Sequence, residues 1–275
     1  WVSGLSLGFI RWVQAYSALY RGKYTWMEGN PTWFPAFQNL FRKNDKYENY
    51  EAQTNQAAGL FLRWLWEDSK AEIYVDFHHN DSKQNIRDLL LDSEHSRAVT
   101  VGLQKVFNIK NDDYLFSWEW TQMEQAATSL VRNAGSWYEH GWVSDGYTNE
   151  GEVLGSSIGP GSNSQYFALS RIRDTEKLGI ALEIIDQDND FYHSAFSNSN
   201  GSWGDYRRHW KDFNLHVNFS KKHKNIWLSS NLMYSRSLNY KWDLEDYATE
   251  YYSPGNDVNN FHITLKLTYL IPLAK

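Results

Sequence analysis

The residues best suited to bind a ligand lie in a glycine-rich segment, residues 137–164. It carries five ring-bearing side chains, namely Trp137, Tyr138, His140, Trp142 and Tyr147. Aromatic rings pack against the apolar faces of sugars, and glycines let a long loop fold compactly. The segment therefore fits a sugar site on a loop that folds into or over a cavity. A structural role, in which the loop only seals the protein, remains the alternative.

A second segment, residues 239–258, mixes aromatic rings with carboxylates. Its candidates for contact with a neutral or basic sugar are Trp242, Asp243 and Tyr251. Rings stack on the sugar, and carboxylate oxygens accept hydrogen bonds from its hydroxyl groups. The alternative is that the tyrosines and Trp242 form an aromatic belt at a membrane interface.

Other kinds of chemistry find little support. Residues 186–190 alternate carboxylates like a calcium loop, but Phe191 stands where such a loop needs glycine, and Ser197 where it needs an acidic residue. No spacing singles out a carboxylate pair for glycoside hydrolysis among Glu119, Glu139, Glu150, Glu152 and Glu183. We therefore expect no metal, no cofactor and no enzymatic activity.

The composition limits the classes of partner that this protein is expected to bind. The net charge of −6 over 275 residues gives no support to nucleic-acid binding. With no cysteine, the chain forms no disulfide and no thiolate metal site. Aromatic residues make up 17%, including 14 Trp and 18 Tyr. Both the interfacial girdles of membrane barrels and sugar-binding surfaces are enriched in this way.

The elements that position these loops are predicted to be strands. Apolar and polar residues alternate in residues 71–78 and 261–269, as in strands with one apolar and one polar face. Ten such strands are predicted, at about 3–13, 57–66, 70–78, 96–107, 113–124, 165–173, 177–185, 209–219, 224–238 and 259–270. Strand cations are expected to face a polar lumen, among them Arg11, Arg63, Arg171 and Lys266.

The connections between these strands alternate in length. Short turns at 67–69, 108–112, 174–176 and 221–224 separate long links at 14–56, 79–95, 125–164, 186–208 and 239–258. This parity predicts an all-β fold, a transmembrane antiparallel up-and-down β-barrel. A soluble all-β fold is the alternative. Helices are expected at 31–41 and 86–91 and within 122–132, where they would plug or cap the barrel.

Several stretches resemble the Wzi-like capsule assembly family. The most specific is 137–161, with Tyr138-Glu139-His140-Gly141, then a run from Gly146 to Gly155, then Ile158-Gly159-Pro160. The strand pair around Arg63-Trp64 and Glu72-Ile73-Tyr74 also agrees. The resemblance spans nearly the whole chain.

The resemblance implies a fold and a function. Family members are outer-membrane barrels of about eighteen strands with a helical plug, and they act as surface lectins that bind capsular polysaccharide. We therefore expect residues 1–275 to be one barrel domain in the cell outer membrane, lacking strands before Trp1. The expected partners are surface polysaccharide, outer-membrane lipid and other outer-membrane proteins. A porin-like channel, or an accessory barrel of a larger complex, is the alternative function.

Overall fold

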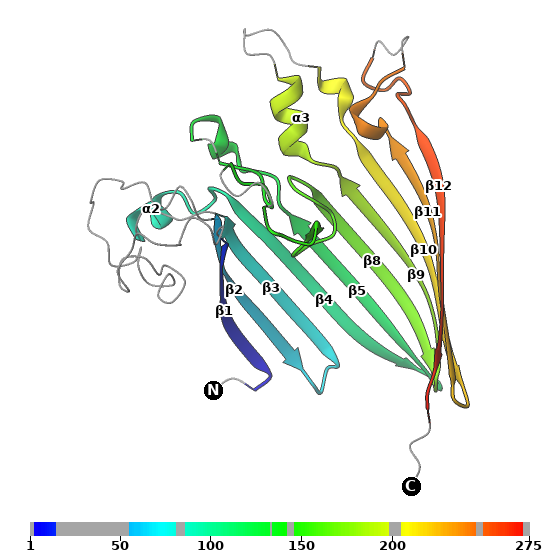
Figure 1. The fold of residues 1–275 in the computed structure, drawn as a ribbon. Helices are drawn as coiled ribbons and strands as arrows, with labels where there is room; N and C mark the ends of the chain where they lie inside the picture. Colours follow the sequence, from blue (N-terminus) through cyan, green and yellow to red (C-terminus); the bar gives the residue numbers. More distant parts are fainter. Residues whose placement is uncertain are drawn as a thin grey trace.

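The computed structural model describes residues 3–14, 55–80, 86–132, 134–141, 146–197, 205–245 and 250–271. Ten strands form one large antiparallel sheet in the order β1-β2-β3-β4-β5-β8-β9-β10-β11-β12 (Figure 1). Their bounds are β1 Leu5–Gln14, β2 Asn55–Trp66, β3 Ala71–Asn80, β4 Arg97–Ile109, β5 Asp112–Gln122, β8 Asn163–Arg173, β9 Glu176–Asp186, β10 Lys211–His223, β11 Ile226–Leu238 and β12 Val258–Tyr269. Each strand pairs with the next strand of the sheet along the chain, which confirms the predicted barrel-type meander.

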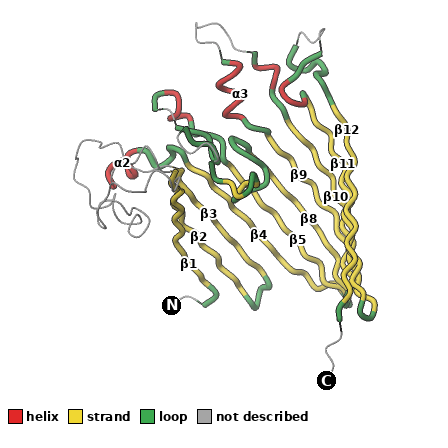
Figure 2. Tube along the Cα trace, in the orientation of Figure 1, coloured by secondary structure: helices red, strands yellow, loops and turns green. Residues whose placement is uncertain are grey.

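The short connections gather at one end of the sheet, and the long ones at the other (Figure 2). Each turn at the short end contains one non-glycine residue with a positive φ, namely Lys70, Lys110, Asp174 and Lys224. Tight hairpin turns demand such conformations because their twist then matches that of the strands. The predicted turn at 221–224 is displaced, since β10 continues to His223 and the chain reverses before Ile226.

The remaining elements are short and lie outside the large sheet. They are α2 Ile86–Leu91, α3 Asn189–Phe196, the 3-10 helices η3 Ala127–Leu130, η4 Tyr206–Arg208 and η5 Tyr240–Trp242, and a small hairpin of β6 Thr148–Asn149 and β7 Glu152–Val153. The helix expected at 86–91 is confirmed as α2, whereas 122–132 contains only η3. The helix expected at 31–41 lies outside the described residues. None of the described helices is long and apolar enough to cross a membrane.

The two faces of the sheet differ in polarity. Hydrogen bonds cross between strands on the face we call the inner face, from Tyr74 Oη to Glu119 at 2.5 Å and between the hydroxyls of Thr100 and Thr121 at 3.1 Å. The opposite, outer face carries exposed apolar side chains, including Leu7, Leu60, Leu169, Ile180, Leu182, Leu215, Leu232, Ile263, Leu265 and Leu267. An apolar exterior around a polar interior is the pattern of a membrane barrel.

The side chains of β5 alternate between the two faces, as its sequence pattern indicates. Glu119 and Thr121 lie on the inner face, where they contact β3 and β4. Because side chains alternate along a strand, Phe116, Trp118 and Trp120 share the outer face. In the paired strand β8, Phe167 and Leu169 lie opposite Trp118 and Phe116 and continue the same apolar surface.

The prediction that strand cations face inward is half right. Arg63 lies on the inner face, paired with Glu72 at 2.5 Å, and Lys266 lies on the same face near Asn231. Alternation places Arg11 and Arg171 on the outer face, so the prediction is wrong for these two. Both lie near strand ends, where the cost of a charge facing lipid falls to about 0–1 kcal/mol.

Candidate functional site

The glycine-rich loop lies against the inner face, close to the ends of β1 to β5. Trp137 and Tyr147 are each only 6% exposed and pack with Ala57, Ala98 and Met123. Trp12 of β1 adds to this cluster, with its ring centroid 6.2 Å from that of Tyr147 and 5.3 Å from that of His78. The main buried apolar cluster of the described chain therefore joins the loop to the sheet.

Backbone contacts hold the loop in this shape. Gly146 has φ +56°, and a side chain there would meet the carbonyl group of Tyr138, so glycine is required. The amide of Leu154 donates to the carbonyl of Tyr147 at 2.9 Å, next to the β6–β7 hairpin. The amide of Ser156 donates to the hydroxyl of Tyr138 at 2.8 Å. Burial of that hydroxyl raises the pKa of Tyr138.

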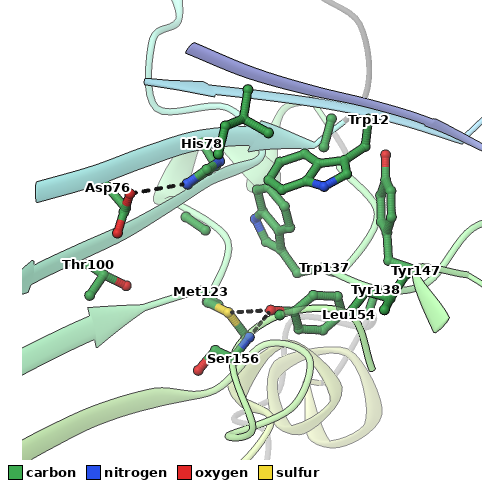
Figure 3. Close-up of a pocket in the computed structure, with 14 residues that line it drawn as sticks. Trp12, Asp76, His78, Thr100, Met123, Trp137, Tyr138, Tyr147, Leu154 and Ser156 are labelled. Atoms are coloured by element: carbon green, nitrogen blue, oxygen red, sulfur yellow. Dashed lines mark hydrogen bonds and ion pairs between the residues drawn. The ribbon is translucent and has the colours of Figure 1, made fainter. Parts of the chain in front are cut away.

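A cavity of about 290 Å³ remains between the loop and β1 to β4 (Figure 3). The rings of Trp12, Trp137, Tyr138 and Tyr147 border it, and its polar groups come from Asp76, His78, Thr100 and Ser156. A mixed aromatic and polar lining is typical of small-molecule sites.

A second aromatic cluster lies at the loop end of the sheet, around α3, η4 and η5; we call it the rim cluster. Trp242 packs on Phe191 with ring centroids 4.4 Å apart and on Trp210 at 5.0 Å. Tyr206 and Tyr251 pair at 5.8 Å with an interplanar angle of 35°. Both tyrosines are more than half exposed, and their rings are therefore accessible to a ligand.

Hydrogen bonds between charged side chains hold η4 in place within the rim cluster. Asp205 accepts hydrogen bonds from Arg207 Nε at 2.7 Å and Arg208 Nε at 2.9 Å. The hydrogen bond from Arg207 is the main reason that the pKa of Asp205 lies below its ordinary value. Arg208 also donates to the carbonyl of Trp242 at 3.0 Å, which joins η4 to η5.

Glu124, just beyond β5, ties α3 to the sheet. Its carboxylate accepts hydrogen bonds from Asn163 at 2.6 Å and Asn189 at 3.0 Å, and His193 Nε2 lies 3.0 Å away. Burial raises the pKa of Glu124, but these hydrogen bonds outweigh it and leave the pKa lowered. The hydrogen bond to Glu124 raises the pKa of His193.

The acidic run 186–190 has structural roles. Asp188 caps α3 by accepting from the amide of Phe191 at 3.0 Å. Asp190 accepts from the amide of Gln125 and the hydroxyl of Ser136, both at 2.8 Å. Among the described residues, no group of three or more His, Cys, Asp or Glu side chains is placed to hold a metal ion.

The structure separates the candidate residues into two groups. Trp137, Tyr138 and Tyr147 meet at the cavity. His140 is partly exposed and does not line it, and Trp142 lies outside the described residues. Trp242 lies in the rim cluster with Tyr251, and Asp243 is exposed beside them.

Some lining residues were not singled out from the sequence. Asp76 and His78 share the inner face through strand alternation, which was a usable signal. Trp12 comes from a strand far away in the sequence, and nothing local marked it. In the rim cluster, Phe191, Tyr206 and Trp210 were also missed.

One motif in the loop was also overlooked. Residues 155–159 read Gly-Ser-Ser-Ile-Gly, which matches Gly-x-Ser-x-Gly. A hydrolase nucleophile with this motif sits on a strand-to-helix turn, beside a histidine base. Here the five residues lie in a loop between β7 and β8. The 320 Å³ pocket that Ser157 lines contains Glu119 and Glu183, but no histidine among its described lining residues.

The sheet order, the alternating connections and the apolar outer face define the class of outer-membrane β-barrel proteins. The model of the capsule assembly protein Wzi family matches residues 27–250. The chain therefore belongs to the Wzi capsule assembly family, which confirms the resemblance seen in the sequence. The family and its barrel fold also confirm the predicted location in the outer membrane.

One similar solved structure is Wzi of Escherichia coli, an outer-membrane, carbohydrate-binding β-barrel involved in group 1 capsule assembly. The TM-score is 0.61 at 12% sequence identity. The match covers 99% of this chain and 50% of that protein, so the chain spans about half its length. No curated protein matches the sequence.

Proposed function

We propose that this protein is an outer-membrane barrel that binds surface or capsular polysaccharide at its loop end and helps to assemble or anchor the capsule. Residues 1–275 are one domain in this proposal, with lipid around the outer face. The observation that carries it is the rim cluster, where aromatic rings and charged groups are exposed together at the end of the sheet that holds the long loops.

The rim cluster suits a long polymer better than the cavity does. Tyr206 and Tyr251 are 55% and 53% exposed, and their rings offer an open surface for consecutive sugars. Asp243 supplies carboxylate oxygens for hydroxyl groups, while Trp242 packs on Phe191 and Trp210 within the same rim cluster. In this proposal Trp137 and Tyr147 anchor the loop, and the stretch of polymer that lies on the rim cluster does not touch them.

The path of the glycine-rich loop favours binding over passage of solutes. A porin-like channel needs an open polar interior, but this loop is packed by buried aromatic rings onto the inner face. A hydrolase needs a converging acid, base or nucleophile, and no histidine is among the described residues that line the pocket beside Ser157 of the Gly-Ser-Ser-Ile-Gly stretch.

The test is binding of the full-length, detergent-purified protein to the surface polysaccharide of its own organism. We expect saturable binding, weakened about tenfold by the double variant Tyr206→Ala, Tyr251→Ala, because two stacking rings contribute roughly 1–3 kcal/mol. Tyr269→Ala, an exposed tyrosine at the opposite end of the sheet, is the control and leaves the affinity unchanged. Absence of binding by the unaltered protein rejects the proposed function.

A further inference from the structure

The cavity beneath the glycine-rich loop is left without a role by the proposed rim surface. Its volume of about 290 Å³ lies near the lower end of the range for small-molecule sites, about 300–1,000 Å³. Leu154 and Gly155 border it and are exposed, so its mouth opens at this part of the loop. Such a space holds one small ring and excludes a length of polymer.

The lining of the cavity has two chemically different sides. Trp12, Trp137 and Tyr147 present aromatic rings, with the Trp12 and Tyr147 ring centroids 6.2 Å apart. Figure 3 shows Asp76 and Thr100 on the side away from Trp12 and Tyr147, while the His78 ring lies next to Trp12, with ring centroids 5.3 Å apart. A pyranose has the same asymmetry, since its C–H face is apolar and its hydroxyls donate and accept hydrogen bonds.

One buried polar atom points to a ligand. The indole N–H of Trp137 is buried and has no hydrogen-bond partner, although the residue is only 6% exposed. Figure 3 shows this nitrogen on the side of the ring that faces Asp76 and His78. Buried donors are satisfied in the great majority of proteins, and a hydroxyl oxygen in the cavity would satisfy this one.

The charges of the cavity select among sugars. Oδ1 of Asp76 lies 3.9 Å from Nε2 of His78. The side chain of Asp76 is 41% exposed, so its carboxylate can accept further hydrogen bonds. None of the described lining residues is a lysine or arginine. An acidic sugar would therefore meet a carboxylate without a cation to balance it.

We propose that this cavity is a subsite for a single neutral pyranose residue, whose apolar face packs on Trp12, Trp137 and Tyr147 and whose hydroxyls meet Asp76, Thr100 and the Trp137 N–H. The inference rests on the proposed function, because it makes this subsite the place where the end of a polysaccharide chain is held. Recognition of a chain end complements the rim cluster, which binds the middle of a chain.

The test uses small probes on the full-length protein in detergent. Methyl glycosides of glucose, galactose and mannose, and methyl glucuronide, are titrated by calorimetry and ligand-observed NMR. Leu154→Trp places a bulky ring at the mouth of the cavity, at a position that is 53% exposed and tolerant of change. Leu130→Trp, at an 89% exposed position of η3 away from the cavity, is the matched control.

We expect at least one neutral glycoside to bind and the glucuronide to bind more weakly. Leu154→Trp lowers the affinity for the glycoside about tenfold or more, whereas Leu130→Trp leaves it within about twofold. Thr100→Val, which removes one hydroxyl without filling the cavity, lowers it several-fold.

Two results overturn the inference and are separable from failure of the proposed function. If the unaltered protein binds the polysaccharide but no neutral glycoside, the subsite is rejected and the rim surface stands. The subsite is also rejected if both tryptophan variants weaken glycoside binding equally. If the unaltered protein binds neither polysaccharide nor glycoside, both proposals fail.

Discussion

At the scale of single residues, the carboxylate of Glu124 connects β8 to α3. Its partners Asn163, Asn189 and His193 belong to β8 and α3. We expect Glu124→Gln to weaken the attachment of α3 by roughly 1–2 kcal/mol, because a hydrogen bond to a charged group is lost. Amide hydrogen exchange within Asn189–Phe196 measures this as faster exchange. Glu152→Gln, at an exposed position of β7, is the control, and equal exchange in both variants would contradict the prediction.

The ion pair of Glu124 and His193 predicts how the attachment of α3 to the sheet depends on pH. The pKa of Glu124 is lowered in the folded protein, so its contribution is lost as pH falls through that lowered pKa. The pKa of His193 is raised, so its contribution is lost as pH rises through that raised pKa. The protection of α3 from hydrogen exchange, relative to the intrinsic exchange rate at each pH, is therefore expected to be greatest between the two pKa values.

A variant without the His193 imidazole distinguishes the loss of protection at acidic pH from the loss of protection at higher pH. In His193→Gln the loss of protection at higher pH should disappear, while the loss at acidic pH persists. Asp190 faces the same region, and burial raises its pKa, so its effect has the opposite sign to that of Glu124 at low pH. An unchanged profile in His193→Gln would refute the assignment to this pair.

At the scale of elements, each strand has one side for lipid and one for the interior. Leu169 and Ala168 are neighbours near the middle of β8, and only Leu169 lies on the outer face. Leu169→Arg is expected to cost about 2–4 kcal/mol of folding free energy in a bilayer, because a charge then faces lipid near mid-depth. Ala168→Arg places the same charge on the inner face. Urea titration of folding into liposomes compares the two variants, and a larger cost for Ala168→Arg than for Leu169→Arg would show that the register is shifted by one residue.

At the scale of the whole molecule, the loop and the sheet act together. Trp137→Ala removes one of the two buried aromatic anchors of the glycine-rich loop, at a cost of roughly 3–5 kcal/mol to its packing. We expect the released loop to leave the inner face and to raise ion conductance in planar bilayers above that of the unaltered protein. Trp120→Ala, on the outer face, is the control. Identical conductance for both variants would mean that the loop does not limit passage.

The two edge strands of the sheet, β1 and β12, carry backbone groups that need hydrogen-bond partners in a membrane. Within the described residues, β1 and β12 each pair with one neighbour only. Unpaired backbone groups are too costly to leave in hydrocarbon. The backbone groups of both edges must therefore find hydrogen-bond partners, in each other or in other strands, when the protein lies in the membrane.

The sequence by itself determined the strands, their parity and the polarity of their faces. These properties are local, because alternation in β5 follows from residues that are adjacent in the chain, and each tight turn is decided by a few residues. The family also followed from the sequence, since the loop from Tyr138 to Pro160 is a contiguous stretch.

Only the tertiary structure decided what each aromatic residue does. Trp137 and Trp242 are both aromatic residues of long loops, yet Trp137 is buried against the sheet and Trp242 is a half-buried member of the rim cluster. Their surroundings come from distant residues, Trp12 for the first and Phe191 for the second. Such contacts depend on the order and register of the strands and on the path of each loop, and no local pattern encodes them.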